Sequence, residues 1–202
     1  MTTKANRVCG FVLLSVSILS LVGWSYKIQA AVSWFPGLVP MQPNAALLFL
    51  LAGVSLIFNL QHFIPSFILA VAGITLCSDL GVTSELQLDS LLTEDPFITI
   101  QTPNPGRMAI NTSFGFVLFA LQYFLPSKPA RWCIETGLVV SVIATIGYLT
   151  GYTSMYRWSP TVTAMALNTA VCFDVLFGFL MYNLYREAAC EVESNPTRIG
   201  TR

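Results

Sequence analysis

Six long apolar segments, separated by short stretches rich in proline, limit what this chain can fold into. A helix needs about 20 mostly apolar residues to cross the hydrocarbon core of a bilayer. The segments that approach this length lie at residues 8–26, 45–62, 64–80, 109–125, 133–152 and 162–185. Only 10% of the 202 residues are charged, whereas soluble domains carry about 25%. The sequence therefore predicts an all-α, polytopic membrane protein with six transmembrane helices.

A short pattern, Met-x-x-Asn-small-small-x-x-Phe, begins the second, fourth and sixth segments. Its copies are Met41, Asn44 and Phe49; Met108, Asn111 and Phe116; and Met165, Asn168 and Phe173. The first and third copies align further without a gap, because adding 124 to the residue number takes Gly23 to Gly147, Trp24 to Tyr148, Trp34 to Trp158 and Asn59 to Asn183. This self-similarity predicts three tandem helical hairpins with a pseudo-threefold internal repeat.

Basic residues predict the orientation of the helices. Cytoplasmic loops carry an excess of lysine and arginine. With the N-terminus inside, seven of the ten basic residues lie inside, and Lys27, Arg107 and Arg157 lie outside. We therefore expect a multi-pass membrane protein with both termini in the cytoplasm. Lys4 and Arg7 before an apolar stretch also resemble a secretory signal peptide, but the match between the first and fifth segments favours a structural helix.

The repeated asparagines support two interpretations. Asparagine in the first turn of a helix caps unpaired amides, and small residues beside it let helices approach closely. On this interpretation the motif only caps and packs. If the hairpins surround a pseudo-threefold axis, however, Asn44, Asn111 and Asn168 converge near the outer leaflet. Buried polar groups in membranes are costly and often functional, so the second interpretation is a ligand pocket.

Other polar residues also have alternative roles. Asp174 lies within the sixth segment, where an ionisable group serves as a proton relay or cation site or pairs with a hydroxyl of the bundle. Arg107 and Arg157 precede two asparagine motifs; they hold an anionic ligand group or anchor at the interface. We expect interfacial water to solvate Asp79, and Trp24 to belong to an outer aromatic belt.

The sequence gives little support to enzymatic chemistry. It contains a single histidine, which excludes the two-histidine zinc motif, and it has no glycine-rich phosphate loop. The five cysteines form no Cys-x-x-Cys pair, so we expect no metal and no cofactor. With a formal net charge of zero and no long basic run, we expect no nucleic-acid partner.

The motifs carry a resemblance to a known kind of membrane region. The runs Pro36-Gly37, Pro40-Met41-Gln42-Pro43-Asn44-Ala45-Ala46-Leu47 and Pro105-Gly106-Arg107-Met108-Ala109-Ile110-Asn111-Thr112 resemble the multi-helix sensor region that precedes the output domains of many bacterial histidine kinases and diguanylate cyclases. In those proteins Pro-Gly-x-Met-x-x-Asn-Thr-Ala repeats likewise begin alternate helices. The resemblance covers residues 10–186 and implies signal sensing, homodimerisation and an inner-membrane location.

The chain departs from this pattern because residues 186–202 contain no output domain. Either it is a stand-alone version that signals through a cytoplasmic kinase or cyclase partner, or it is a fragment of a longer protein. We expect a six-helix transmembrane domain, residues 1–186, and a short cytoplasmic tail, residues 187–202, with residues 182–193 continuing the last helix.

We interpret the chain as a sensory module, not an enzyme, that lies in the lipid bilayer as a homo-oligomer and binds a small or lipid-like ligand near the outer leaflet. The alternatives are a small transporter or channel that uses Asp174, and a structural subunit of a membrane complex. The candidate ligand-binding residues are Met41, Asn44, Arg107, Met108, Asn111, Arg157, Met165, Asn168 and Asp174.

Overall fold

A computed structural model describes residues 4–60, 62–81, 107–159 and 162–194. Within these ranges the chain contains seven α-helices, one 3-10 helix and no strands, which confirms an all-α protein. The elements are α1 (Lys4–Ser25), α2 (Gln29–Ser33), α3 (Pro43–Phe58), α4 (Phe63–Asp79), α5 (Ile110–Leu121), α6 (Ser127–Thr150), the 3-10 helix η2 (Thr153–Met155) and α7 (Leu167–Ser194).

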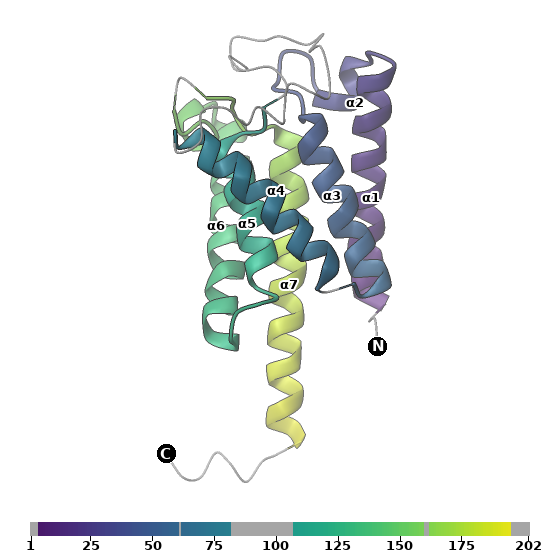
Figure 1. Cartoon of the computed structure of the whole chain (residues 1–202), viewed down its shortest axis with the longest axis vertical. Coiled ribbons are helices and arrows are strands. Elements are labelled where there is room, and N and C mark those ends of the chain that lie inside the picture. Colours follow the sequence, from purple (N-terminus) through teal and green to yellow (C-terminus); the bar gives the residue numbers. More distant parts are fainter. Residues whose placement is uncertain (1–3, 61, 82–106, 160–161, 195–202) are drawn as a thin grey trace.

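The long helices alternate in direction along one axis, and α4 crosses the front of the bundle obliquely (Figure 1). We call the end where α3, α5 and α7 begin the upper end, and the opposite end, near the N-terminus, the lower end. The most extensive helix contacts join α1 to α3, α6 to α7 and α4 to α5. Consecutive long helices therefore pack as hairpins, as the sequence predicts.

Each of the six apolar segments forms a helix, but several bounds differ from the prediction. α6 begins at Ser127 and not at residue 133. Its first turns contain the polar residues Lys128 and Arg131, so the apolar run alone did not mark the start of the helix. α7 begins at Leu167, after the predicted residue 162, and residues 163–166 before it are not helical. The expected continuation of the last helix over residues 182–193 is confirmed, since α7 ends at Ser194. The short elements α2 and η2 carry no such apolar run and are not predicted.

Three of the described helices are long and apolar enough to cross a membrane: Lys4–Ser25, Ser127–Thr150 and Leu167–Arg186. The other three long helices are apolar but shorter, with 16 residues in α3, 17 in α4 and 12 in α5. At 1.5 Å per residue, the last of these spans only about 18 Å. Three helices of the described residues therefore have the length and composition of membrane spans, and the other three are apolar but shorter.

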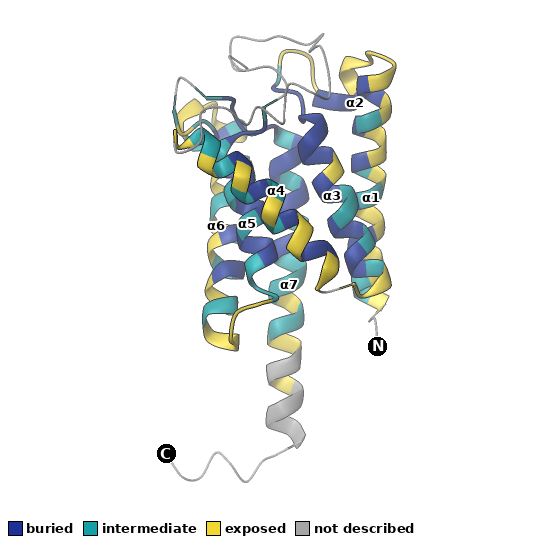
Figure 2. Ribbon diagram, viewed as in Figure 1, coloured by how far each residue is buried: buried dark blue, intermediate teal, exposed yellow. Residues whose placement is uncertain are grey.

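The three phenylalanines of the repeated motif form the centre of the core. The ring centroids of Phe49 and Phe116 lie 4.6 Å apart, those of Phe49 and Phe173 4.6 Å, and those of Phe116 and Phe173 4.8 Å. The rings meet edge to face or tilted, which is the favourable arrangement for aromatic pairs. All three side chains are buried, as Figure 2 shows for the interior faces of the helices. One residue from each of α3, α5 and α7 thus meets its counterparts on the bundle axis.

Close helix approaches depend on glycine. A Cβ atom added to Gly10 of α1 would lie 2.8 Å from the carbonyl oxygen of Gly53 in α3, and one added to Gly53 would lie 2.8 Å from that of Gly10. A Cβ on Gly137 of α6 would overlap the ring of Phe177 in α7. Small residues commonly permit such contacts between membrane helices, so α1 and α3 approach backbone to backbone and α6 admits a ring of α7.

We predict that Phe116→Ala lowers the free energy of unfolding by about 3–5 kcal/mol, because it opens a cavity at the centre of the aromatic triangle. The control is Phe11→Ala, because Phe11 is 58% exposed on the outer face of α1 and should change the free energy by less than about 1 kcal/mol. Reversible unfolding in mixed detergent micelles measures both values. Equal losses in the two variants would contradict the central role of the triangle.

Candidate functional site

Each motif asparagine is the second residue of its helix. Asn44, Asn111 and Asn168 follow the first residues of α3, α5 and α7, and their exposed fractions are 6%, 2% and 1%. The Oδ1 atom of Asn44 accepts the N–H of Ala45 at 2.8 Å, and that of Asn168 accepts the N–H of Thr169 at 3.1 Å. In two of the three copies the asparagine oxygen thus accepts the amide of the next residue within the first turn, while the residue before α3, Gln42, makes no side-chain cap bond.

The side-chain nitrogens of two asparagines reach the loop of another hairpin. Asn168 Nδ2 donates to the carbonyl oxygen of Val32 at 2.8 Å. Asn111 Nδ2 donates to the carbonyl oxygen of Tyr156 at 3.1 Å. Val32 lies in α2 and Tyr156 directly follows η2, and the two positions are 124 residues apart. Two amides thus make the same contact with two different hairpins.

The same two carbonyls also bind the methionines of the motif. The backbone N–H of Met41 donates to Val32 O at 2.8 Å, and that of Met165 donates to Tyr156 O at 2.9 Å. The side chains of Met41, Met108 and Met165 are all at most 1% exposed. Met41 and Asn168 therefore share the carbonyl of Val32, and Met165 and Asn111 share that of Tyr156, so the amide nitrogens of Asn111 and Asn168 bind protein backbone.

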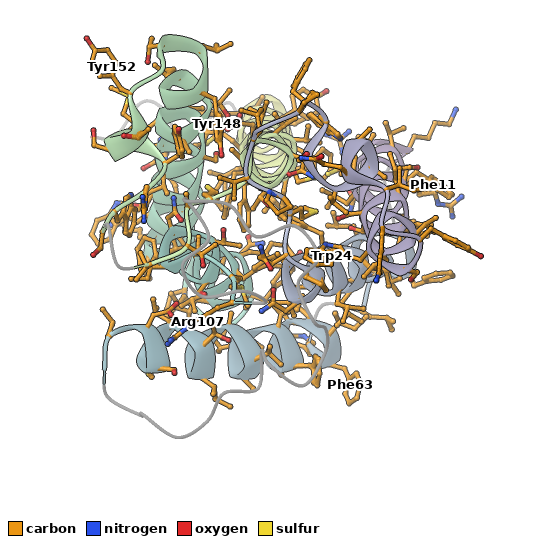
Figure 3. The ribbon with its side chains drawn as sticks, turned by 90° about the horizontal axis from the view of Figure 1, so that it is seen from above. Phe11, Trp24, Phe63, Arg107, Tyr148 and Tyr152 are labelled. Atoms are coloured by element: carbon orange, nitrogen blue, oxygen red, sulfur yellow. The ribbon has the colours of Figure 1, made fainter. Side chains whose placement is uncertain are left out.

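An aromatic side chain supports the helix start in two hairpins. Trp24 Nε1 donates to Met41 O at 2.7 Å, and the Tyr148 hydroxyl donates to Met165 O at 2.6 Å. Trp24 is buried and Tyr148 is half-buried, and Figure 3 shows both from above. The expectation of an interfacial belt is wrong for Trp24, which is 6% exposed, because its indole N–H has a buried carbonyl to bind.

A glycine precedes each of these aromatic residues and admits the neighbouring turn. A Cβ on Gly23 would lie 2.6 Å from the Cβ of Ala31, and a Cβ on Gly147 would lie 2.6 Å from the Cβ of Met155. These contacts press α2 against the end of α1 and η2 against the end of α6. These contacts hold α2, which contains the acceptor Val32, and η2, which directly precedes the acceptor Tyr156.

In the middle hairpin, an ion pair and not an aromatic side chain joins the end of one helix to the start of the next. Asp79 ends α4, and its Oδ1 lies 2.5 Å from Nε of Arg107. Arg107 Nη2 also donates to the hydroxyl of Ser78 at 2.9 Å. The Asp79 side chain is 2% exposed, so the expected solvation by interfacial water is wrong. Arg107, 26% exposed and close to α4 in Figure 3, joins the end of α4 to the start of α5.

Asp174 lies apart from the asparagines, between α6 and α7. The hydroxyl of Thr145 donates to its Oδ2 at 2.6 Å, whereas its buried Oδ1 has no hydrogen-bond partner among the described residues. Asp174 is six residues below Asn168, about 9 Å along a helix. The geometry matches the interpretation that this carboxyl pairs with a hydroxyl of the bundle.

The remaining candidates form no single site with these groups. Arg157 Nε donates to the carbonyl oxygen of Val162 at 3.3 Å, within its own loop. Among the residues that the structure describes, no three His, Cys, Asp or Glu side chains gather as they would around a metal ion. Thr145 and the acceptor carbonyls of Val32 and Tyr156 were not predicted from the sequence. The repeat that aligns Gly23-Trp24 with Gly147-Tyr148 is the sequence signal nearest to them.

The chain was compared with protein families, curated proteins and solved structures. No family model matches it, and neither a curated protein nor a solved structure does.

We predict that Asn168→Leu lowers the free energy of unfolding by about 1–2 kcal/mol, because the variant loses both the amide link to Val32 O and the cap at Thr169. Asn111→Leu should give a similar loss. Thr150→Val, at an exposed residue of α6 that bonds only within its helix, should stay within about 0.5 kcal/mol. If Asn168→Leu is as stable as Thr150→Val, the amide links contribute nothing.

Proposed function

We propose that this chain is an integral membrane sensory module. In this proposal, six membrane-crossing helices form three tandem hairpins around a pseudo-threefold axis, both termini lie in the cytoplasm of a bacterial cell, and the upper end lies at the outer leaflet. A small or lipid-like ligand binds there, and α7 carries the response to a cytoplasmic kinase or cyclase. The resemblance to sensor regions and the contacts described above support this proposal.

The observation that carries the proposal is the length of α7. It runs for 28 residues and extends well below the other helices (Figure 1). The same helix begins at the upper end with Asn168, bound to Val32 O, and carries Phe173 at the bundle centre. One continuous element therefore connects the proposed input end to the opposite side of the membrane, as a signalling helix must.

Short helices still reach across the bilayer in this proposal. Irregular backbone is tolerated at membrane depth where protein satisfies its polar groups. The residues that precede α3 and α5 include Met41 and Met108, which are buried, and Met41 N bonds to Val32 O. These residues would extend the paths of α3 and α5 toward the outer surface without exposing free amides to lipid.

A bound ligand would act through the two loops whose carbonyls bind Asn111 and Asn168. Two amides hold α5 and α7 to loops of other hairpins, so a ligand that moves a loop changes the packing of a neighbouring hairpin. Arg107 and Arg157 supply positive charge at the same end, and Asp79 already balances Arg107. Such a ligand would shift the population between two packings of the bundle.

The test measures thermal unfolding of the purified protein in nanodiscs, with and without lipid extract of bacterial inner membranes. A ligand at about 100 times its Kd stabilises by about 2.7 kcal/mol, which raises Tm by about 5–10 °C in a chain of this size. We expect this increase in the wild type and in Phe11→Ala, and its loss in Asn111→Leu. An unchanged wild-type Tm would count against ligand sensing.

A transporter or channel is the second candidate, and the pair of Asp174 with Thr145 favours it, because an ionisable group within a span commonly lies on an ion pathway. Proton or cation flux into proteoliposomes that disappears in Asp174→Asn but persists in Asn111→Leu would establish this function in place of sensing. A purely structural subunit would show neither flux nor an extract-dependent Tm, and would copurify with a fixed membrane partner.

A further inference from the structure

Asn183, in the lower part of α7, aligns in the repeat with Asn59, the residue at which α3 ends. Asn59 and Asn183 are 124 residues apart, and they belong to the aligned copies of the sequence. Asn59 adopts a left-handed conformation, φ 59° and ψ 38°, and terminates α3 with its N–H bonded to Ser55 O. Asn183 lies inside α7, which continues to Ser194.

Local chemistry does not favour a helix at Asn183. Asparagine is a weak helix former and among the few residues that readily adopt the left-handed conformation in which helices end. The Oδ1 atom of Asn183 is buried and accepts no hydrogen bond from a described residue. Continuation of α7 past this residue therefore depends on contacts from outside the helix.

Two such contacts come from different hairpins. Asn183 Nδ2 donates to Oδ1 of Asn6 in α1 at 3.3 Å. Two residues further along, the hydroxyl of Tyr185 accepts a hydrogen bond from Arg131 Nη2 of α6 at 3.5 Å, and the guanidinium of Arg131 lies 5.6 Å from the ring centroid of Tyr185. Arg131 is oriented by Glu135, whose Oε1 accepts from its Nε at 2.6 Å.

The contacts at Asn183 and Tyr185 lie on opposite faces of α7. Residues two apart on a helix point about 200° apart, so α1 binds one side and α6 the other just where α7 leaves the bundle (Figure 1). A change in the spacing of α1 and α6 weakens at least one contact.

We propose that Asn183 is a hinge in α7. Its contact with Asn6 and the contact of Arg131 with Tyr185 keep the helix continuous through this residue. When a change in bundle packing breaks these contacts, α7 ends at Asn183, as α3 ends at Asn59, and residues 184–194 no longer continue the helix of residues 167–182. This inference rests on the proposed sensory function and names the element that such a sensor would switch.

The experiment is hydrogen exchange of the full-length protein in nanodiscs, followed by mass spectrometry of peptides from α7. The variant Asn6→Ala with Arg131→Gln removes both contacts. We expect exchange in residues 184–194 to rise at least fivefold and exchange in residues 167–180 to stay unchanged. Adding Asn183→Ala to this variant should restore protection about threefold, because alanine favours the helix over asparagine by that factor. Lys128→Gln, in the first turn of α6, is the control for charge removal.

Three results would overturn the hinge: unchanged exchange when both contacts are removed, a rise along all of α7, or no recovery with Asn183→Ala. Position 59 provides a matched comparison. There Asn59→Gly should be tolerated and Asn59→Ala should raise exchange in the lower loop after α3, because alanine disfavours a positive φ. The measurement needs no ligand or partner, so it can succeed when sensing fails, and a rigid α7 would leave the sensory proposal standing.

Discussion

Two backbone carbonyls, those of Val32 and Tyr156, carry the links on which the upper end of the molecule depends. Each accepts one hydrogen bond from its own hairpin and one from an asparagine of another. A carbonyl oxygen has two lone pairs, so both bonds form without competition. Because irregular backbone within a bilayer must be satisfied by protein, these links allow α2 and η2 to rest against the helix starts and relate one hairpin to the next.

The aromatic triangle below these links explains why the same motif carries a phenylalanine. An asparagine at the second position of a helix fixes where that helix begins, and five residues deeper Phe49, Phe116 and Phe173 come to the same level on the axis. A shift of one helix by a turn, about 5.4 Å, would remove its ring from the triangle. The amide links of Asn111 and Asn168 hold α5 and α7 at the level at which their rings meet.

Periodicity and self-similarity predicted the helices and their pairing along the chain, because burial in apolar segments leaves a direct signal in the sequence. The meeting of the three motif phenylalanines on the axis was not predicted. The polar contacts were harder to predict. Asp79 looked like an interfacial acid, yet it is buried against Arg107, because the partner lies 28 residues away beyond a loop. Thr145 carries no signal at all, since a hydroxyl within a helix usually bonds its own backbone. Backbone acceptors such as Val32 O are independent of residue type, so no sequence pattern identifies them.

Asn59 and Asn183 show how tertiary contacts override equal local preference. Both are asparagines at aligned positions, and intrinsic propensity disfavours a helix equally at both. In α3 the neighbouring Leu60 returns its N–H to Ser55 O and the chain turns. In α7 the side chain finds Asn6 instead, and the helix continues. The same residue type thus ends one helix and lies inside another, and in α7 the continuing helix is accompanied by contacts with α1 and α6.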